Sequence, residues 1–196
     1  MDTYVNDVRQ AISALSDRGS PPAEAEQSVP SRPGLYAIHA DRPVWEQLGL
    51  EPRDEKTPLY VGKAERSLTS RDLRTHFRTG RTGSSTVRRS LAALLRERLS
   101  LHAVPRNQAR PRHFANYGLE AEGDARLTAW MHEHLTIAVW ATLDLELGVI
   151  ETLVIDHWQP PLNLSKVSVP SPILKAARQA MADEARRAGH ADERSG

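Results

Sequence analysis

The sequence predicts an α+β fold in which helices flank a small antiparallel or mixed sheet. Segments of β-type composition come at residues 34–39 and 58–62, and a third follows at 135–143 after several helical segments. This order lacks the regular strand-helix alternation of a doubly wound parallel sheet. The chain has 196 residues and is 39% hydrophobic, enough for one well-packed core. We therefore expect a single globular domain with extensions.

The N-terminal part predicts a helix followed by a linker. Its apolar residues recur at helical spacing; they are Val5, Val8, Ile12 and Leu15. Residues 16–34 are rich in Pro, Ser and Gly and so predict a loop. We expect 1–30 to be a helical arm and linker, 31–168 to be the main domain, and 169–196 to be a C-terminal amphipathic helix with a charged tail.

The first two strands are expected to pair as an antiparallel hairpin whose long loop holds a turn of helix at about 44–50. Helices are then predicted at about 67–78, from a Ser/Thr cap at 84–86 to about 99, and from Asp124 to 135. The third strand follows, and a last helix from about 145 to 157 ends before two prolines.

Composition disfavours several classes of protein. The absence of cysteine rules out disulfides and thiolate-metal sites, and the N-terminus lacks the basic and apolar regions of a signal peptide. The longest apolar stretch, 135–143, is shorter than the roughly 18 residues that a membrane span needs. We expect a cytoplasmic protein with no membrane segment.

The positive charge is concentrated in one part of the chain. Residues 63–112 hold thirteen basic and three acidic residues, a net charge of +10, whereas the rest carries −9 of the overall +1. Arginine predominates, and its guanidinium pairs with phosphate in a bidentate fork, so the segment favours a polyanion-binding face. The alternative is a solvated face neutralised by acidic neighbours.

Glu151 is the most informative single residue. With 100° per residue, it falls at about 40° around its predicted helix, between Trp158 at about 20° and Ile155 at about 80°, with Leu147 at 0°. A carboxylate on an apolar stripe costs several kcal/mol unless it is paired or holds a metal. Glu151 therefore predicts either an ion pair with one of the arginines or a metal ligand.

Several features occur in a fixed order along the chain. They are "GLY" at 34–36, "YVGK" at 60–63, an arginine and a histidine in the next helix, Glu151, and "PPLN" ending at Asn163. Taken singly, two tyrosines on strands or a lysine at a strand end are ordinary. As an ordered set over residues 31–166, they resemble the GIY-YIG nuclease superfamily.

The resemblance implies a central three-stranded antiparallel sheet, with the terminal helices as extensions. It implies a metal-dependent DNA endonuclease, a hydrolase of phosphodiester bonds that uses one Mg²⁺ or Mn²⁺ ion. Glu151 is then the protein ligand of the ion, with water and phosphate oxygen completing the shell, which suits magnesium. Asn163 orients the site.

The resemblance also assigns the chemistry. Tyr60 is the expected general base toward the attacking water, with Tyr36 as its companion. A phenol with an ordinary pKa near 10 needs nearby positive charge to act at neutral pH, and Lys63 could supply it. Arg71 and Lys63 are expected to stabilise the charge that develops on phosphorus, and the metal ion to stabilise the leaving oxygen.

The helix after "YVGK" departs from the family pattern. The family has an arginine and then a histidine or tyrosine four residues later, whereas Arg71 precedes His76 by five, a rotation of about 140°. Arg74 is the alternative arginine, and Thr75 occupies the position that the histidine would have in strict register, four residues after Arg71. We expect Arg71 and His76 in the site, with either arginine able to enter it.

The remaining arginines of the segment are expected on the DNA backbone. Residues 80–86 lack the lysine of a nucleotide-binding P-loop but could offer backbone N–H groups to a phosphate. The expected DNA contacts are Arg74, Arg78, Arg81, Arg88 and Arg89.

Two other functions compete with the nuclease. One is a non-catalytic nucleic-acid-binding module that keeps the fold, and the other is a protein-interaction domain whose basic face meets acidic partners. The joint presence of both tyrosines, Lys63, Glu151 and Asn163 favours the enzyme, because binding alone has no need of a carboxylate near phosphate.

Overall fold

The structure is a computed structural model that describes residues 4–68, 75–107, 114–143 and 146–193. It divides into two compact units. The first unit comprises Met1–Arg74 and His132–Pro170, and the second comprises Thr75–Met131 and Ser171–Gly196. The predicted division at residues 30 and 168 stays a prediction.

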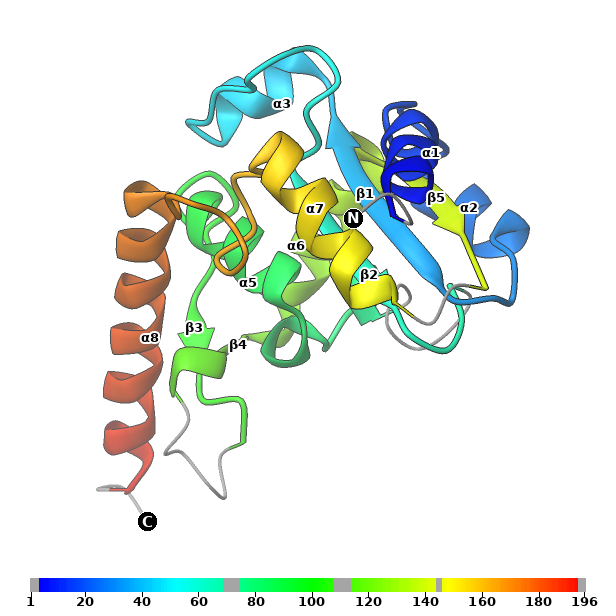
Figure 1. The fold of residues 1–196 in the computed structure, drawn as a ribbon. Helices are drawn as coiled ribbons and strands as arrows, with labels where there is room; N and C mark the ends of the chain where they lie inside the picture. Colours follow the sequence, from blue (N-terminus) through cyan, green and yellow to red (C-terminus); the bar gives the residue numbers. More distant parts are fainter. Residues whose placement is uncertain (1–3, 69–74, 108–113, 144–145, 194–196) are drawn as a thin grey trace. The chain divides into compact units, whose positions relative to one another are not determined.

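The first unit is built on a three-stranded antiparallel sheet with the strand order β2-β1-β5 (Figure 1). Its elements are α1 (Val5–Leu15), α2 (Pro22–Ser28), β1 (Gly34–Ala40), α3 (Arg42–Gln47), β2 (Tyr60–Ala64), β5 (Leu135–Ala141) and α7 (Leu147–Trp158). The predicted α+β class and the antiparallel pairing of the first two strands are confirmed. Since β1 lies between β2 and β5, residues 34–40 pair directly with residues 135–141, which are far away in the sequence.

One face of this sheet is covered by α1 and α7, which are seen in front of the strands in Figure 1. Leu35, Ala37 and Val61 from the strands pack there with apolar residues of both helices. Side chains alternate along a strand, so Tyr36 and Tyr60 point to the other face.

The N-terminal segment forms the expected helix, α1, and a second helix within the expected loop. Ala11 and Leu15 of α1 are fully buried in the core of the first unit. The expected loop also contains α2, which starts with Pro22 in the first turn, where the missing N–H of proline costs nothing.

The second unit is mainly helical. Its elements are η1 (Thr82–Ser84), α5 (Thr86–Leu94), β3 (Ala103–Val104), η2 (Phe114–Asn116), β4 (Gly118–Leu119), the greater part of α6 (Ala121–His134) and α8 (Pro172–Glu193). The predicted cap of α5 is confirmed, because the Ser85 side chain accepts a hydrogen bond from the Arg88 N–H. Asp124 does not cap α6 as expected, since the helix begins three residues earlier at Ala121.

The C-terminal helix α8 is part of the second unit and contacts α5, β3 and η2. Its buried side chains include Leu174, Met181 and Ala185, which follow helical spacing. In the described part of the chain, no helix is both long and apolar enough to cross a membrane.

Candidate active site

The register of β1 and β2 brings the two tyrosines together. Tyr36 lies opposite Gly62, and Tyr60 lies opposite Ile38. The two phenol rings are 6.2 Å apart between centroids and tilted by 38°. A Cβ added at Gly62 would lie 2.5 Å from the Tyr36 hydroxyl oxygen, closer than real Cβ contacts come. The glycine between Tyr60 and Lys63 therefore makes room for the Tyr36 hydroxyl.

The two tyrosines differ in their exposure. Tyr36 is 3% exposed, whereas Tyr60, on the strand at the edge of the described sheet, is partly exposed. Tyr60 is thus the phenol that an external molecule can reach.

Asn163 fixes the outer edge of β2. Its side-chain Oδ1 accepts a hydrogen bond from the Val61 N–H at 3.0 Å, and its Nδ2 donates to the Val61 carbonyl at 2.9 Å. The buried amide thereby pairs with β2 as a neighbouring strand would. Because Val61 stands next to both Tyr60 and Gly62, Asn163 holds the segment that carries the tyrosine.

We expect Asn163→Asp and Asn163→Ala to loosen this edge in different ways. The aspartate variant still accepts from the Val61 N–H but turns an acceptor toward the Val61 carbonyl, which should cost about 1–3 kcal/mol of stability. The alanine variant loses both bonds. Hydrogen exchange followed by mass spectrometry or NMR should show the Val61 amide exchanging at least about tenfold faster in the alanine variant, with smaller acceleration in the aspartate variant. Equal protection in all three proteins would contradict the clamp.

Glu151 lies on the buried side of α7, as the helical spacing predicts, and is 8% exposed. Among the residues that the structure describes, its ion-pair partner is a lysine and not one of the arginines of residues 63–112. The Lys166 ammonium donates to Glu151 Oε2 at 2.5 Å and lies 3.4 Å from the Gly148 carbonyl. The site at Glu151 therefore accepts a cation beside a buried carboxylate.

Lys63 approaches the same stretch of α7. Its ammonium would lie 3.6 Å from a Cβ added at Gly148, and it pairs with Glu65 at 2.7 Å. The hydrogen bond to Glu65 raises the pKa of Lys63, and the charge of Glu151 raises it further. Lys63 is thus held as a cation. Its exposed pairing with Glu65 is of the weak surface kind that another anion can replace.

His76 belongs to the second unit and has an internal partner there. It is 8% exposed, and its Nδ1 hydrogen-bonds the Ser85 hydroxyl at 2.7 Å. Burial, together with the charges of Arg88 and Arg89, lowers the pKa of His76 to about 4, so the ring is neutral near pH 7. The hydroxyl that caps α5 is thereby tied to His76.

Arg88 and Arg89, expected on DNA, are turned inward. Arg88 is fully buried, and its guanidinium pairs with the Asp124 carboxylate at 3.1 Å. The guanidinium also donates hydrogen bonds to the side chains of Thr82, Thr128 and Met131 and to the backbone carbonyls of His76 and Asp124. Arg89 is 7% exposed and donates to the Gly83 carbonyl at 2.8 Å. Because both guanidinium groups bind partners in the interior, these two arginines are not among the proposed DNA contacts.

Of the other basic residues in the prediction, Arg71 and Arg74 are outside the described residues. Arg78 and Arg81 are exposed on the second unit.

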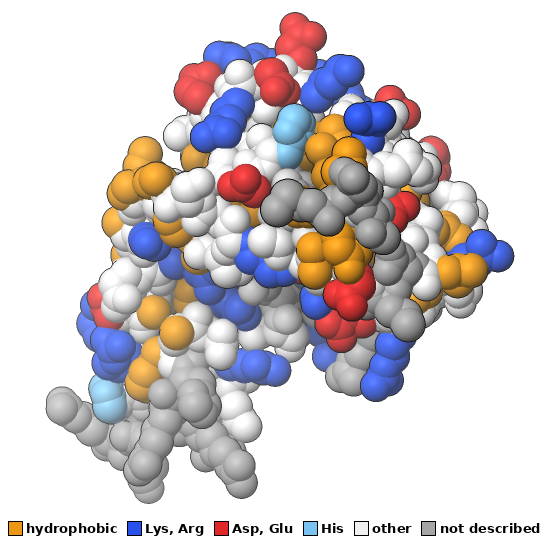
Figure 2. Space-filling model, viewed as in Figure 1, with side chains coloured by type: hydrophobic (Ala, Val, Ile, Leu, Met, Phe, Trp, Pro, Cys, Tyr) orange, Lys and Arg blue, Asp and Glu red, His pale blue; other side chains and the backbone are white. Residues whose placement is uncertain are grey.

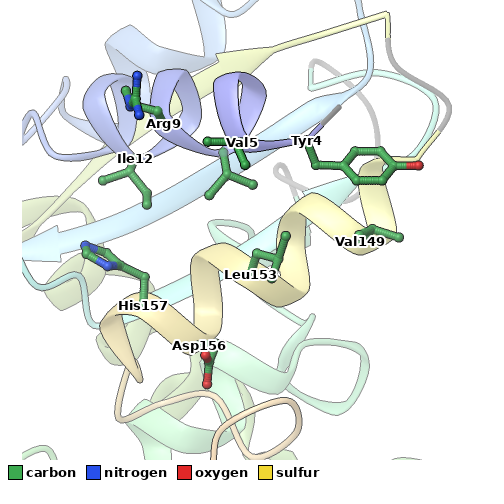
Figure 3. A pocket seen from close by; sticks show the side chains of 9 residues that line it. Tyr4, Val5, Arg9, Ile12, Val149, Leu153, Asp156 and His157 are labelled. Carbon is green, nitrogen blue, oxygen red and sulfur yellow. The ribbon is translucent and has the colours of Figure 1, made fainter. Parts of the chain in front are cut away.

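A separate apolar groove lies between α1 and α7 (Figure 3). Val5 and Ile12 line it from α1, and Val149 and Leu153 line it from α7. Hydrophobic side chains are visible at the surface in this region in Figure 2. Val149 and Leu153 stand about 160° from Glu151 around the helix, so the groove is distinct from the Glu151 site.

The comparisons identify the family. A family model described as the GIY-YIG catalytic domain matches residues 37–185, which is well over half of the chain. The chain belongs to the GIY-YIG family. No curated protein and no solved structure matches it. Membership in the GIY-YIG family indicates a nuclease. The matched range contains Tyr60, Glu151 and Asn163, and Tyr36 lies one residue before it.

A divalent ion fits this GIY-YIG site on its donor chemistry. Glu151 offers a hard oxygen ligand, and the Lys166 ammonium already stands beside it as a cation. Among the described residues, no group of three or more His, Asp or Glu side chains is arranged so that it could hold a metal ion. A metal ion at Glu151 would therefore take most of its ligands from water and phosphate, as Mg²⁺ commonly does.

Sequence reasoning did not find Lys166. The one sequence feature that could have indicated it is its position three residues after Asn163, in the loop that leads from α7 back to the edge of β2. The contact with Glu151 depends on the path of that loop, which spacing alone does not define.

Proposed function

We propose that this GIY-YIG nuclease is a metal-dependent DNA endonuclease that hydrolyses phosphodiester bonds with one divalent ion, Mg²⁺ or Mn²⁺. The observation that carries the proposal is Glu151, a buried carboxylate on the apolar side of α7 that holds a cation in the structure. Lys63 of the neighbouring strand β2 lies over the same stretch of α7, so a second cation stands near this carboxylate, which a lone structural ion pair would not need.

Glu151 would hold the ion, which would supply Lewis-acid stabilisation of the phosphate and of the leaving oxygen. Tyr60, the partly exposed phenol, would take the proton of the attacking water. Lys63 would exchange its contact with Glu65 for a phosphate oxygen and so offset charge on the reacting group. Asn163 would keep Tyr60 in place through Val61.

Tyr36 supports Tyr60 from within the sheet. Since its ring is buried beside Tyr60 and its hydroxyl lies over Gly62, it can order the position of the reactive phenol. Arg71 or Arg74 would contribute the remaining positive charge. On the second unit, exposed Arg78 and Arg81 are the proposed contacts to the DNA backbone.

Supercoiled plasmid provides the direct test of this proposal. We expect the protein to convert it to nicked or linear DNA with Mg²⁺ or Mn²⁺ and to leave it intact with EDTA. Adding excess metal after EDTA should restore cleavage. Cleavage that persists undiminished in EDTA would contradict the metal dependence. DNA binding without cleavage under every metal condition would favour the binding module instead.

A further inference from the structure

The loop that follows α7 is pinned at both ends. At its start, Gln159 has a left-handed backbone, with φ of 50°, and its side-chain oxygen accepts from the Ser168 N–H at 2.6 Å and hydroxyl at 2.8 Å. In the middle, Asn163 pairs with Val61 of β2. These contacts restrict the backbone of residues 159–168 and so restrict where the side chains of this loop lie.

Lys166 sits in this pinned segment with an unusual backbone. Its φ is 65°, a left-handed conformation that a long side chain rarely adopts. The next residue, Val167, packs against the core of the first unit. Such strain persists where surrounding contacts over-determine it and is concentrated at functional sites. Here the conformation places the ammonium on Glu151 and near the Gly148 carbonyl.

The charge balance around Glu151 requires such a partner. A carboxylate with 11% side-chain exposure is strongly destabilised unless a cation lies beside it. The other nearby ammonium, Lys63, already pairs with Glu65. The side chain of Lys166 is 32% exposed, so its ammonium can move from Glu151 into solvent without a rearrangement of the core.

We propose that Lys166 is a built-in counter-ion that occupies the cation position on Glu151 and is displaced when a divalent ion binds. This inference rests on the proposed role of Glu151 as the metal ligand. The ammonium stabilises the metal-free protein and competes with the ion for the same carboxylate. The free protein accordingly binds its divalent ion weakly.

The test uses the full chain without DNA and measures the Kd for Mn²⁺ by electron paramagnetic resonance of the unbound ion. Lys166→Met, which keeps side-chain length and removes the charge, should bind Mn²⁺ about tenfold more tightly than the native protein. Lys166→Arg should bind within about threefold of the native protein. Lys175→Met, which removes an exposed charge on α8, is the matched control and should match the native protein.

Thermal unfolding in EDTA gives a readout independent of the metal. Lys166→Met and a second variant, Lys166→Gln, should each unfold about 3–6 °C lower than the native protein, because Glu151 loses its partner. Unchanged unfolding of both variants would overturn the counter-ion role. Circular dichroism verifies that each variant is folded before its Kd is measured.

The outcomes separate the two proposals. Equal or weaker Mn²⁺ binding by Lys166→Met, with native binding intact, overturns the competition while leaving Glu151 as the ligand. Absence of Mn²⁺ binding in the native protein and in every Lys166 variant overturns the metal site itself, and this inference with it.

Discussion

Glu151→Gln is expected to lower the rate of metal-dependent DNA cleavage by at least about 10³-fold, because the amide keeps the shape of the side chain but removes the charge that would hold the ion. Loss of a metal's charge stabilisation amounts to several kcal/mol in the transition state, and each 1.36 kcal/mol is a tenfold change in rate. Single-turnover cleavage of a labelled duplex measures the effect. The fold should survive, because an uncharged group in this buried position needs no cation.

Asp156→Asn provides the matched control on the same helix. Asp156 lies about 140° from Glu151 around α7, is exposed, and its side chain accepts a hydrogen bond from Gln159 that an amide oxygen can also accept. Its cleavage rate should stay within about twofold of the native rate. DNA affinity in EDTA, measured by fluorescence anisotropy, should be preserved in both variants. A Glu151→Gln protein that cleaves at the native rate would refute the assignment of the ligand.

The position of Glu151 could be predicted because it follows from one helix. Three apolar neighbours at helical spacing define the buried side of α7, and a carboxylate among them must have a partner. The identity of the partner could not be predicted in the same way. Lys166 reaches Glu151 through a loop whose path depends on Gln159 and Asn163, contacts that sequence spacing does not reveal.

The sheet was predictable for a similar reason, and three smaller elements were not. Alternating and apolar segments around Tyr36 and Tyr60 define strands by local pattern. The helix α2 lies within a stretch rich in Pro and Ser, and its start at Pro22 is a signal that was outweighed by the surrounding loop residues. The strands β3 and β4 have two residues each, too short for any periodic pattern.

The charge count was the least reliable guide to function. Net charge does not distinguish a guanidinium that faces solvent from one that faces an internal carboxylate. Asp124 shows the difference, because it is 2% exposed and accepts from the Gly80 N–H and the Thr82 hydroxyl as well as pairing with Arg88. An acidic residue 36 positions away thus neutralises part of the basic segment.

Arg88→Met should destabilise the protein by about 3–5 kcal/mol, the largest stability effect that we expect from a single substitution outside an apolar core. The guanidinium links η1, α5 and α6 within the second unit, and its removal leaves the buried Asp124 carboxylate without a countercharge. Urea unfolding followed by circular dichroism measures the change as a lower midpoint. Arg186→Met is the matched control, because its side chain is 47% exposed, and its pair with Asp183 and its contact with the Phe114 ring should each contribute no more than about 1 kcal/mol.

The double variant Arg88→Met with Asp124→Leu distinguishes the stability that comes from the ion pair from the stability that comes from the packing of the two side chains. Removing both charges leaves no carboxylate without a partner, so the double variant should lose less stability than the two single losses added together. It should still fall below the native protein, because the Thr82 hydroxyl and the Gly80 N–H also lose the acceptor that Asp124 provides. Strict additivity would mean that the two charges do not stabilise each other. A native midpoint for Arg88→Met alone would show that this arginine is free to leave the interior, and would return it to the candidates for DNA binding.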